Sequence, residues 1–262
     1  MKSAVKTKIR KIITVVAWSL LVAGLGVLVG FINAGHRKVA CREINVTIDF
    51  QGGEQLISEA RIRKIIRQDT LNDKKLTDID LVRIENRLNK IGIIQKADVY
   101  TTITGNLNIR IEQCRPLVRV YNTAGQSYYI DMKGNLAFES PGYPANVPIA
   151  TGAIKTKYSD TLNVLQPDAP KVLTDLFRLS EFIFNEPFLK AQIEQIYVDP
   201  DREFELIPRV GRHIIVFGGT DRMEDKFEKL MLFYHEGLNK TGWEKYRVIN
   251  LKFENQVVCT KK

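Results

Sequence analysis

The sequence is poor in the residues from which catalytic and metal sites are built. Its 262 residues include three histidines and three cysteines. His36, His213 and His235 show none of the paired spacings of zinc sites, and the cysteines form no Cys-x-x-Cys motif. No nucleophile elbow occurs, and no glycine-rich phosphate loop is followed by Lys and Ser or Thr. We therefore expect a protein that is not an enzyme and that has no metal site and no cofactor.

The small number of cysteines also limits cross-linking. Cys41, Cys114 and Cys259 can form at most one disulfide within the chain. Their spacing does not say which pair would be joined, and buried or free thiols are an equal alternative. Both possibilities stay open at the level of the sequence.

Acidic residues are missing from the N-terminal segment, and this explains the charge of the chain. The formal net charge is +9, from 39 Lys and Arg against 30 Asp and Glu. Eight of these basic residues and none of the acids lie before Glu43, so 31 basic and 30 acidic residues remain. Because residues 43–262 are nearly neutral, we expect no basic surface along which the phosphates of a nucleic acid could bind, and therefore no nucleic-acid partner.

One long apolar run organises the chain. Residues 12–32 contain no charged side chain, and roughly 21 residues at about 1.5 Å each cross the ~30 Å hydrocarbon core of a bilayer. Basic residues dominate both flanks, and the denser cluster in residues 1–11 favours a short cytoplasmic tail with the rest of the chain outside. We therefore expect a single-pass protein of the bacterial cytoplasmic (inner) membrane, with its C-terminal domains periplasmic or extracytoplasmic.

Two other interpretations of this run are weaker. A cleaved signal peptide has a shorter apolar core and a small-residue cleavage site, which this sequence does not show clearly. A lipoprotein would use Cys41, but Arg37 and Lys38 separate that cysteine from the apolar run. Gly26 and Gly30 form a small-xxx-small pair that permits close packing of two spans, although glycine is common in membrane helices.

Residues 43–116 predict a small α+β domain. Ile44, Val46 and Ile48 alternate with polar residues, as in a half-buried strand. Two amphipathic helices follow, the second marked by Thr77 and Asp80 at its start. Two further alternating segments, 97–103 and 107–111, flank a Gly-Asn turn. The expected order is β-α-α-β-β, with both helices on one face of the sheet.

Residues 117–262 predict a β-rich domain with flanking helices. Short strands alternate with turns up to residue 152, a helix follows Pro170, and residues 192–217 form a three-stranded meander. A second helix after Asp221 leads to one closing strand, in which Ile249, Leu251 and Phe253 share a face. We expect His213, in the meander, to lie at a surface or a sheet edge.

These features together resemble a known family. A single N-terminal span followed by a β-α-α-β-β unit that ends at Arg115-Pro116 is similar to the polypeptide-transport-associated (POTRA) domain of the bacterial cell-division family FtsQ/DivIB. The later segments resemble the β-domain of the same family in the same order. They are Tyr129-Ile130-Asp131 with Gly134, Pro148 with Thr151-Gly152, Glu205-Leu206 with Pro208 and Gly211, and the closing run YRVINLKFENQVV, residues 246–258.

The resemblance implies a division scaffold at the septum that binds FtsB-type and FtsL-type single-span proteins and other divisome components and helps control septal cell-wall synthesis. The layout is then a tail at 1–11, a span at 12–32, a POTRA domain at 43–116 and a β-domain at 117–262 that ends in a partner-binding strand. An alternative is a membrane-anchored POTRA chaperone for secreted or outer-membrane polypeptides.

The resemblance also implies contact residues. For the small partners they are Leu251, Phe253, Val257, Val258, Tyr234 and Trp243; for recruitment they are Lys96, Val99 and Thr101. The alternation of Leu251 with Phe253, and of Val99 with Thr101, also fits the buried face of a strand. Trp243 equally fits a packing role beside the helix. Val257 and Val258 follow polar residues near the C-terminus, which favours exposure.

Overall fold

A computed structural model describes residues 18–25, 43–70, 79–102, 104–138, 144–238, 240 and 242–262, with the side chains of 67–70 left out. Residues 18–25 are helical, and the rest of the expected span at 12–32 lies outside the described residues, as do Thr77, Cys41 and His36. Within the described ranges, no helix has both the length and the apolar character needed to cross a bilayer.

Contacts between Cα atoms divide the chain into two compact units. The first comprises Met1–Thr47, Glu59–Arg87 and Ala97–Arg110, and the second comprises Ile48–Ser58, Leu88–Lys96 and Ile111–Lys262. The fold class is α+β, as the sequence predicts, with a small three-stranded sheet followed by a large sheet of nine strands.

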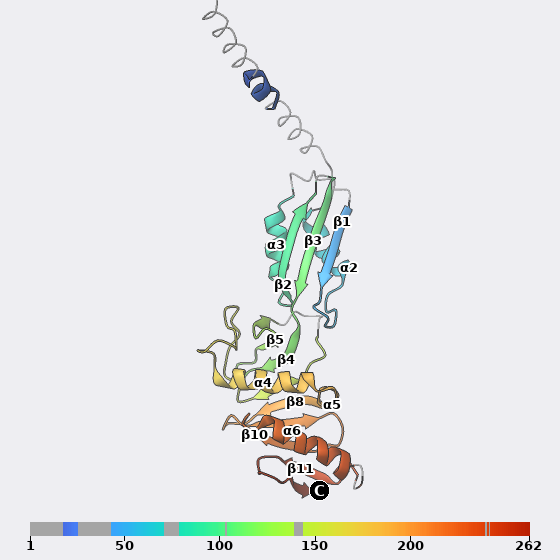
Figure 1. The fold of residues 1–262 in the computed structure, drawn as a ribbon, viewed down its shortest axis with the longest axis vertical. Helices are drawn as coiled ribbons and strands as arrows, with labels where there is room; N and C mark the ends of the chain where they lie inside the picture. The colour runs from blue at the N-terminus through green and yellow to red at the C-terminus, as the bar shows by residue number, and fades with distance from the viewer. Residues whose placement is uncertain are drawn as a thin grey trace, which may run out of the picture. The chain divides into compact units, whose positions relative to one another are not determined.

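The small sheet has the predicted β-α-α-β-β order. Its elements are β1 (Glu43–Asp49), α2 (Glu59–Thr70), α3 (Leu81–Asn89), β2 (Ile94–Thr101) and β3 (Asn106–Gln113). The strand order is β1-β3-β2, so β1 and β2 are both edges, and α2 and α3 lie behind the strands in Figure 1. Since the helices share one face of the sheet, the unit has two layers.

Local sequence explains the two helices of this unit. The Asp80 carboxylate accepts a hydrogen bond from the backbone N–H of Arg83 at 2.9 Å, and so caps α3. The helix then buries Ile84 and Leu88, four residues apart on one face. In α2, Ile62 and Ile66 are buried with the same spacing. The apolar spacing of the sequence therefore sets which faces meet the sheet.

The large sheet contains nine strands. They are β4 (Pro116–Tyr121), β5 (Ser127–Asp131), β6 (Leu136–Phe138), β7 (Ile149–Gly152), β8 (Ile193–Val198), β9 (Phe204–Pro208), β10 (Ile214–Gly218), β11 (Tyr246–Asn250) and β12 (Val258–Lys261). Their order is β12-β11-β10-β9-β8-β7-β4-β5-β6. The pairs β4–β7, β7–β8 and β10–β11 are parallel, and the predicted meander β8–β9–β10 is antiparallel.

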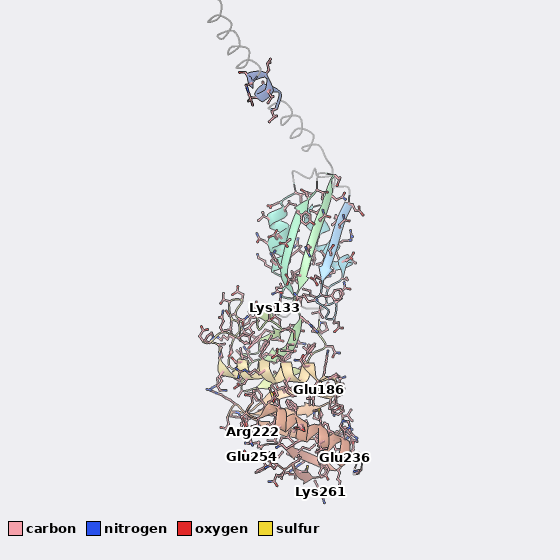
Figure 2. All side chains as sticks on the ribbon, viewed as in Figure 1. Lys133, Glu186, Arg222, Glu236, Glu254 and Lys261 are labelled. Carbon is pink, nitrogen blue, oxygen red and sulfur yellow. The ribbon has the colours of Figure 1, made fainter. Side chains whose placement is uncertain are left out.

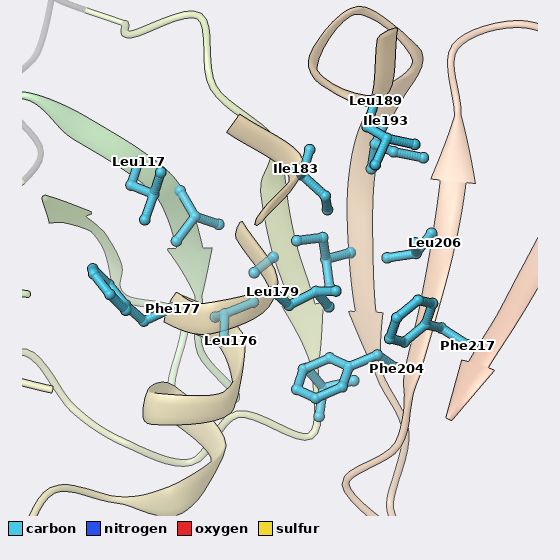
Figure 3. Close-up of a cluster of buried hydrophobic side chains, with 14 of the residues drawn as sticks. Leu117, Leu176, Phe177, Leu179, Ile183, Leu189, Ile193, Phe204, Leu206 and Phe217 are labelled. Carbon is cyan, nitrogen blue, oxygen red and sulfur yellow. The ribbon is translucent and has the colours of Figure 1, made fainter. Parts of the chain in front are cut away.

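Helices cover one face of this sheet. They are α4 (Lys171–Asn185), α5 (Pro187–Gln192), α6 (Met223–Leu232) and the π-helix η2 (Phe233–Leu238). In Figure 1, α4 and α6 cross in front of the strands. Figure 3 shows Leu179 of α4 close to Phe204 of β9, with Phe217 of β10 beside them. The core therefore lies between the helix layer and one face of the sheet.

The closing segment differs from the single strand that the alternation predicts. Strand β11 ends at Asn250, residues 251–257 form a turn, and β12 returns antiparallel to β11. The Asn250 side chain accepts a hydrogen bond from the backbone N–H of Lys252 at 3.0 Å, and Asn255 has a positive φ of 55°. Both features are typical of turns and interrupt a strand. As a result Leu251 is buried whereas Phe253 is exposed.

Candidate partner-binding surface

The C-terminal strand lies at the edge of the large sheet. β12 is the terminal strand in the sheet order, and β11 is its neighbour within the described sheet. The pairing joins Asn250 to Val258 and Val248 to Thr260. An edge strand presents backbone N–H and C=O groups that a further strand can pair with. The opposite edge, β6, has three residues, so β12 is the longer of the two edges.

Contacts from α6 and β10 hold the turn before β12. The Lys229 ammonium donates to the Phe253 carbonyl oxygen at 2.6 Å, and the Leu251 N–H donates to the Val216 carbonyl oxygen at 2.9 Å. Arg222, before α6, forms an ion pair with Glu254 in the turn, and both are labelled in Figure 2. These contacts tie the turn to the core layer, so the edge strand is anchored at its start.

Two of the predicted contact residues are exposed near this edge. Phe253 is 46% exposed and Val258 is 41% exposed. Val257 is partly buried against the core, and Leu251 is fully buried. Apolar surface at a strand edge favours binding over solvation, because covering it removes apolar area from water. The surface defined by Phe253, Val257, Val258 and the β12 edge is called the β12 surface below.

Tyr234 is buried and is therefore not part of this surface. Its side chain is 1% exposed, and its hydroxyl lies 2.8 Å from Nε2 of His213, which is 2% exposed. Burial raises the pKa of the Tyr234 hydroxyl and lowers that of the His213 imidazole. The half-buried Trp243 ring stands 5.1 Å from the Tyr234 ring. The expectation that His213 is a surface or edge residue is therefore wrong.

The sequence explains why His213 is buried. Gly211 has φ +107°, and a Cβ at this position would stand 2.5 Å from the His213 ring. A side chain at residue 211 would therefore displace the imidazole. Nδ1 of His213 lies beside Gly211, whose backbone raises the pKa of the imidazole and partly offsets the effect of burial. In the sequence, the glycine two residues before His213 was the signal for this packing. It could not be interpreted by itself, because the packing partner Tyr234 is distant in sequence.

Basic residues surround the β12 surface. Lys261 is the last residue of β12 and Lys262 follows it; Arg247 lies in β11 and Lys245 precedes that strand, and all four are exposed. Figure 2 labels Lys261 near the C-terminal end of the chain. Lysine at an edge disfavours pairing with another basic or identical edge. The same charge favours a partner strand that carries Asp or Glu.

The residues predicted for recruitment lie on both faces of β2. Lys96 and Thr101 are exposed, and Val99 is buried. Exposed Tyr100 was not among the predicted residues, although it lies on the same strand face as Lys96 and Asp98. Because side chains alternate between the two faces of a strand, the sequence could have placed Tyr100 on the exposed face of β2. In the described part of the chain, β2 is an edge strand of the small sheet.

The described residues contain no group of three or more His, Cys, Asp or Glu arranged to hold a metal ion. The two described cysteines, Cys114 and Cys259, are free thiols. Burial raises the pKa of the Cys114 thiol to about 12, so this thiol stays protonated near neutral pH. The β12 surface offers backbone hydrogen bonding at a strand edge, exposed apolar side chains and basic charge.

Comparison with known proteins identifies two matching families. Residues 115–260 match the family described as FtsQ/DivIB, C-terminal related, and residues 39–112 match the POTRA-like domain. A cell division protein FtsQ from Rhodothermus marinus is 26% identical over 187 residues. This alignment covers 70% of the present chain and 66% of that protein, so the chain spans slightly less than two thirds of the relative's length.

Proposed function

Because the chain belongs to the FtsQ/DivIB family, we propose that it is a non-catalytic scaffold of bacterial cell division. It binds FtsB-type and FtsL-type proteins outside the cytoplasmic membrane and helps control septal cell-wall synthesis. Its layout is a cytoplasmic tail at 1–11, a transmembrane helix at 12–32, a POTRA domain at 43–116 and a β-domain at 117–262. The apolar run at 12–32 and its basic flanks support the membrane anchor.

The observation that carries the proposal is the anchored edge strand β12. A partner segment adds as a further strand beside Val258–Lys261, and main-chain hydrogen bonds supply affinity without any catalytic group. Phe253 and Val258 contribute exposed apolar area to the same contact. Leu251 and Tyr234 are buried, so they stabilise the core of the domain and do not touch the partner directly.

The charge around the edge selects the partner. Exposed Lys245, Arg247, Lys261 and Lys262 outnumber the exposed acids of this segment, Glu244 and Glu254. We expect the partner strand to place Asp or Glu opposite these basic residues, with binding that weakens as salt rises. For recruitment to the division site, the exposed side chains of Lys96, Tyr100 and Thr101 on β2 make the contact, and buried Val99 supports the strand.

Substitution of Val258 tests the edge mechanism. Val258→Asp places a charge where the partner strand must exclude water, and Val258→Thr keeps the β-branched shape. We expect pull-down of the FtsB-type and FtsL-type proteins to be lost with Val258→Asp and kept with Val258→Thr. Val82→Asp, at an exposed valine of α3, is the matched control and should bind as the unmodified chain does. Full retention of binding by Val258→Asp would exclude the β12 edge as the contact.

Imaging separates the scaffold from a POTRA chaperone. A fluorescent fusion of the full chain should form a band at midcell, and depletion should give filaments with unfinished septa. Uniform envelope fluorescence with normal septation would instead favour the chaperone function.

A further inference from the structure

A cavity in the second unit lies away from the β12 surface. Its volume is ≈ 570 Å³, within the roughly 300–1,000 Å³ typical of ligand sites. The described residues around it come from β4, residues 144–149, the C-terminal half of α4, α5, the start of β8 and the end of β9. In the sheet order, β9, β10 and β11 separate β8 from β12. A strand that adds to β12 therefore does not fill this cavity.

The charge in the cavity wall is mainly positive. Arg119, Lys190 and Arg209 line it, and Glu194 is the one carboxylate among its described lining residues. Lys190 and Arg209 are exposed, and neither forms an ion pair with a described carboxylate. These two cations therefore remain available to an anionic group that enters from solvent.

An apolar wall stands directly beside the cations. The Lys190 ammonium lies 4.0 Å from the centre of the Phe184 ring, and the Arg115 guanidinium carbon lies 4.9 Å from the same centre. Pro144, Pro148 and Pro187 also line the cavity. Rigid rings of this kind offer flat apolar surface at low entropic cost. The cavity can thus accept an apolar group next to an acidic one.

A buried hydroxyl in the wall lacks a partner. Ser180, on α4, is 1% exposed, and its Oγ has no hydrogen-bond partner within the described structure. A serine inside a helix ordinarily bonds to the carbonyl four residues earlier or faces solvent. An unpaired buried hydroxyl is uncommon, and a ligand with a polar atom is one source of the missing bond.

We propose that this cavity binds an acidic peptide segment of a partner, at a site separate from the β12 surface. Carboxylates of the peptide pair with Lys190 and Arg209, an apolar side chain packs on Phe184 and the prolines, and a polar atom of the peptide bonds to Ser180. A peptide fits better than a small inorganic anion, because only a peptide uses the apolar wall as well as the cations. Nucleic acid is disfavoured by the near neutrality of the body of the chain.

A display library of random heptapeptides, selected against the full chain in detergent micelles, tests the site. We expect enrichment of sequences with at least two carboxylates and an apolar residue. A fluorescein-labelled copy of the selected peptide is then titrated by fluorescence polarisation. The double variant Lys190→Glu and Arg209→Glu should weaken binding by about tenfold or more, since two attractive charges become repulsive. Arg178→Glu, on the exposed side of α4, is the matched control and should change binding less than about twofold.

Two further measurements locate the peptide. Ser180→Ala should weaken binding without lowering the melting temperature, because it removes a hydroxyl that is unpaired in the free chain. Val258→Asp should leave peptide binding unchanged, because β12 is distant in the sheet order. The proposal is overturned if selected peptides carry no carboxylate excess, if the double charge reversal has no effect, if Val258→Asp abolishes peptide binding, or if inorganic phosphate competes as well as the peptide.

Discussion

Replacing Tyr234 by Phe separates a core role of this residue from a role in partner contact. The substitution keeps the ring, which packs 5.1 Å from Trp243 and 5.7 Å from Phe188. It removes the hydroxyl that lies 2.8 Å from Nε2 of His213. Because Tyr234 is buried, we expect the change to lower stability and to leave partner binding intact.

The size of the expected stability loss follows from the hydrogen bonding of His213. Loss of the Tyr234 hydroxyl leaves Nε2 of the buried His213 imidazole without its partner. An unsatisfied buried polar group costs about 1–3 kcal/mol. For a domain of this size, such a loss lowers the melting temperature by about 2–12 °C.

Near-ultraviolet circular dichroism of the full chain in detergent measures the melting temperature, and pull-down measures partner binding. Tyr197→Phe, at an exposed tyrosine of β8, is the matched control and should melt within about 1 °C of the unmodified chain. If Tyr234→Phe melted like this control, the hydrogen bond to His213 would not stabilise the fold. Loss of partner binding at unchanged melting temperature would instead make the Tyr234 hydroxyl a direct contact.

Two further predictions follow from buried ionisable groups. Burial lowers the pKa of His213, so the unfolded chain takes up a proton near pH 6.5 that the folded chain refuses. Stability should therefore be greatest above about pH 6.5 and fall as the pH drops below it, and the fall should be less steep in His213→Gln. Equal slopes in His213→Gln and the unmodified chain would contradict the burial of His213. Burial raises the pKa of Cys114 to about 12, so in a Cys41→Ser background maleimide at pH 7.5 should label the partly exposed Cys259 and reach Cys114 only after denaturation. Rapid labelling of Cys114 in the folded chain, followed by mass spectrometry of its peptide, would refute this.

The sequence alone predicted most of the elements, because each is set by a local period. The β-α-α-β-β order, the helix after Pro170 and the meander over 192–217 all follow from apolar residues that recur at helical or strand spacing. The family was also evident from short segments such as Tyr129-Ile130-Asp131 with Gly134. There the Asp131 carboxylate accepts the backbone N–H of Lys133 and of Asn135, a turn that local sequence specifies.

The position of each strand in the sheet was not available from the sequence. Three pairs are parallel, and β10 pairs with β11 across a helix, so neighbours in the sheet are distant in the chain. Alternation says that a segment is a strand but does not say whether it is central or at an edge. The exposure of the β12 edge is thus a property of the assembled sheet.

The assembled fold also decides which of the candidate contact residues are exposed and which are buried. Residues 246–258 have the alternation of one strand, yet the turn at 251–257 buries Leu251 and exposes Phe253. Tyr234 has the spacing of a helix stripe, and its role depends on His213, which Gly211 allows to pack beneath it. The local spacing of apolar residues therefore determined which helices and strands form. Long-range strand pairing and packing decided which of their residues face a partner, since burial depends on contacts that no single segment contains.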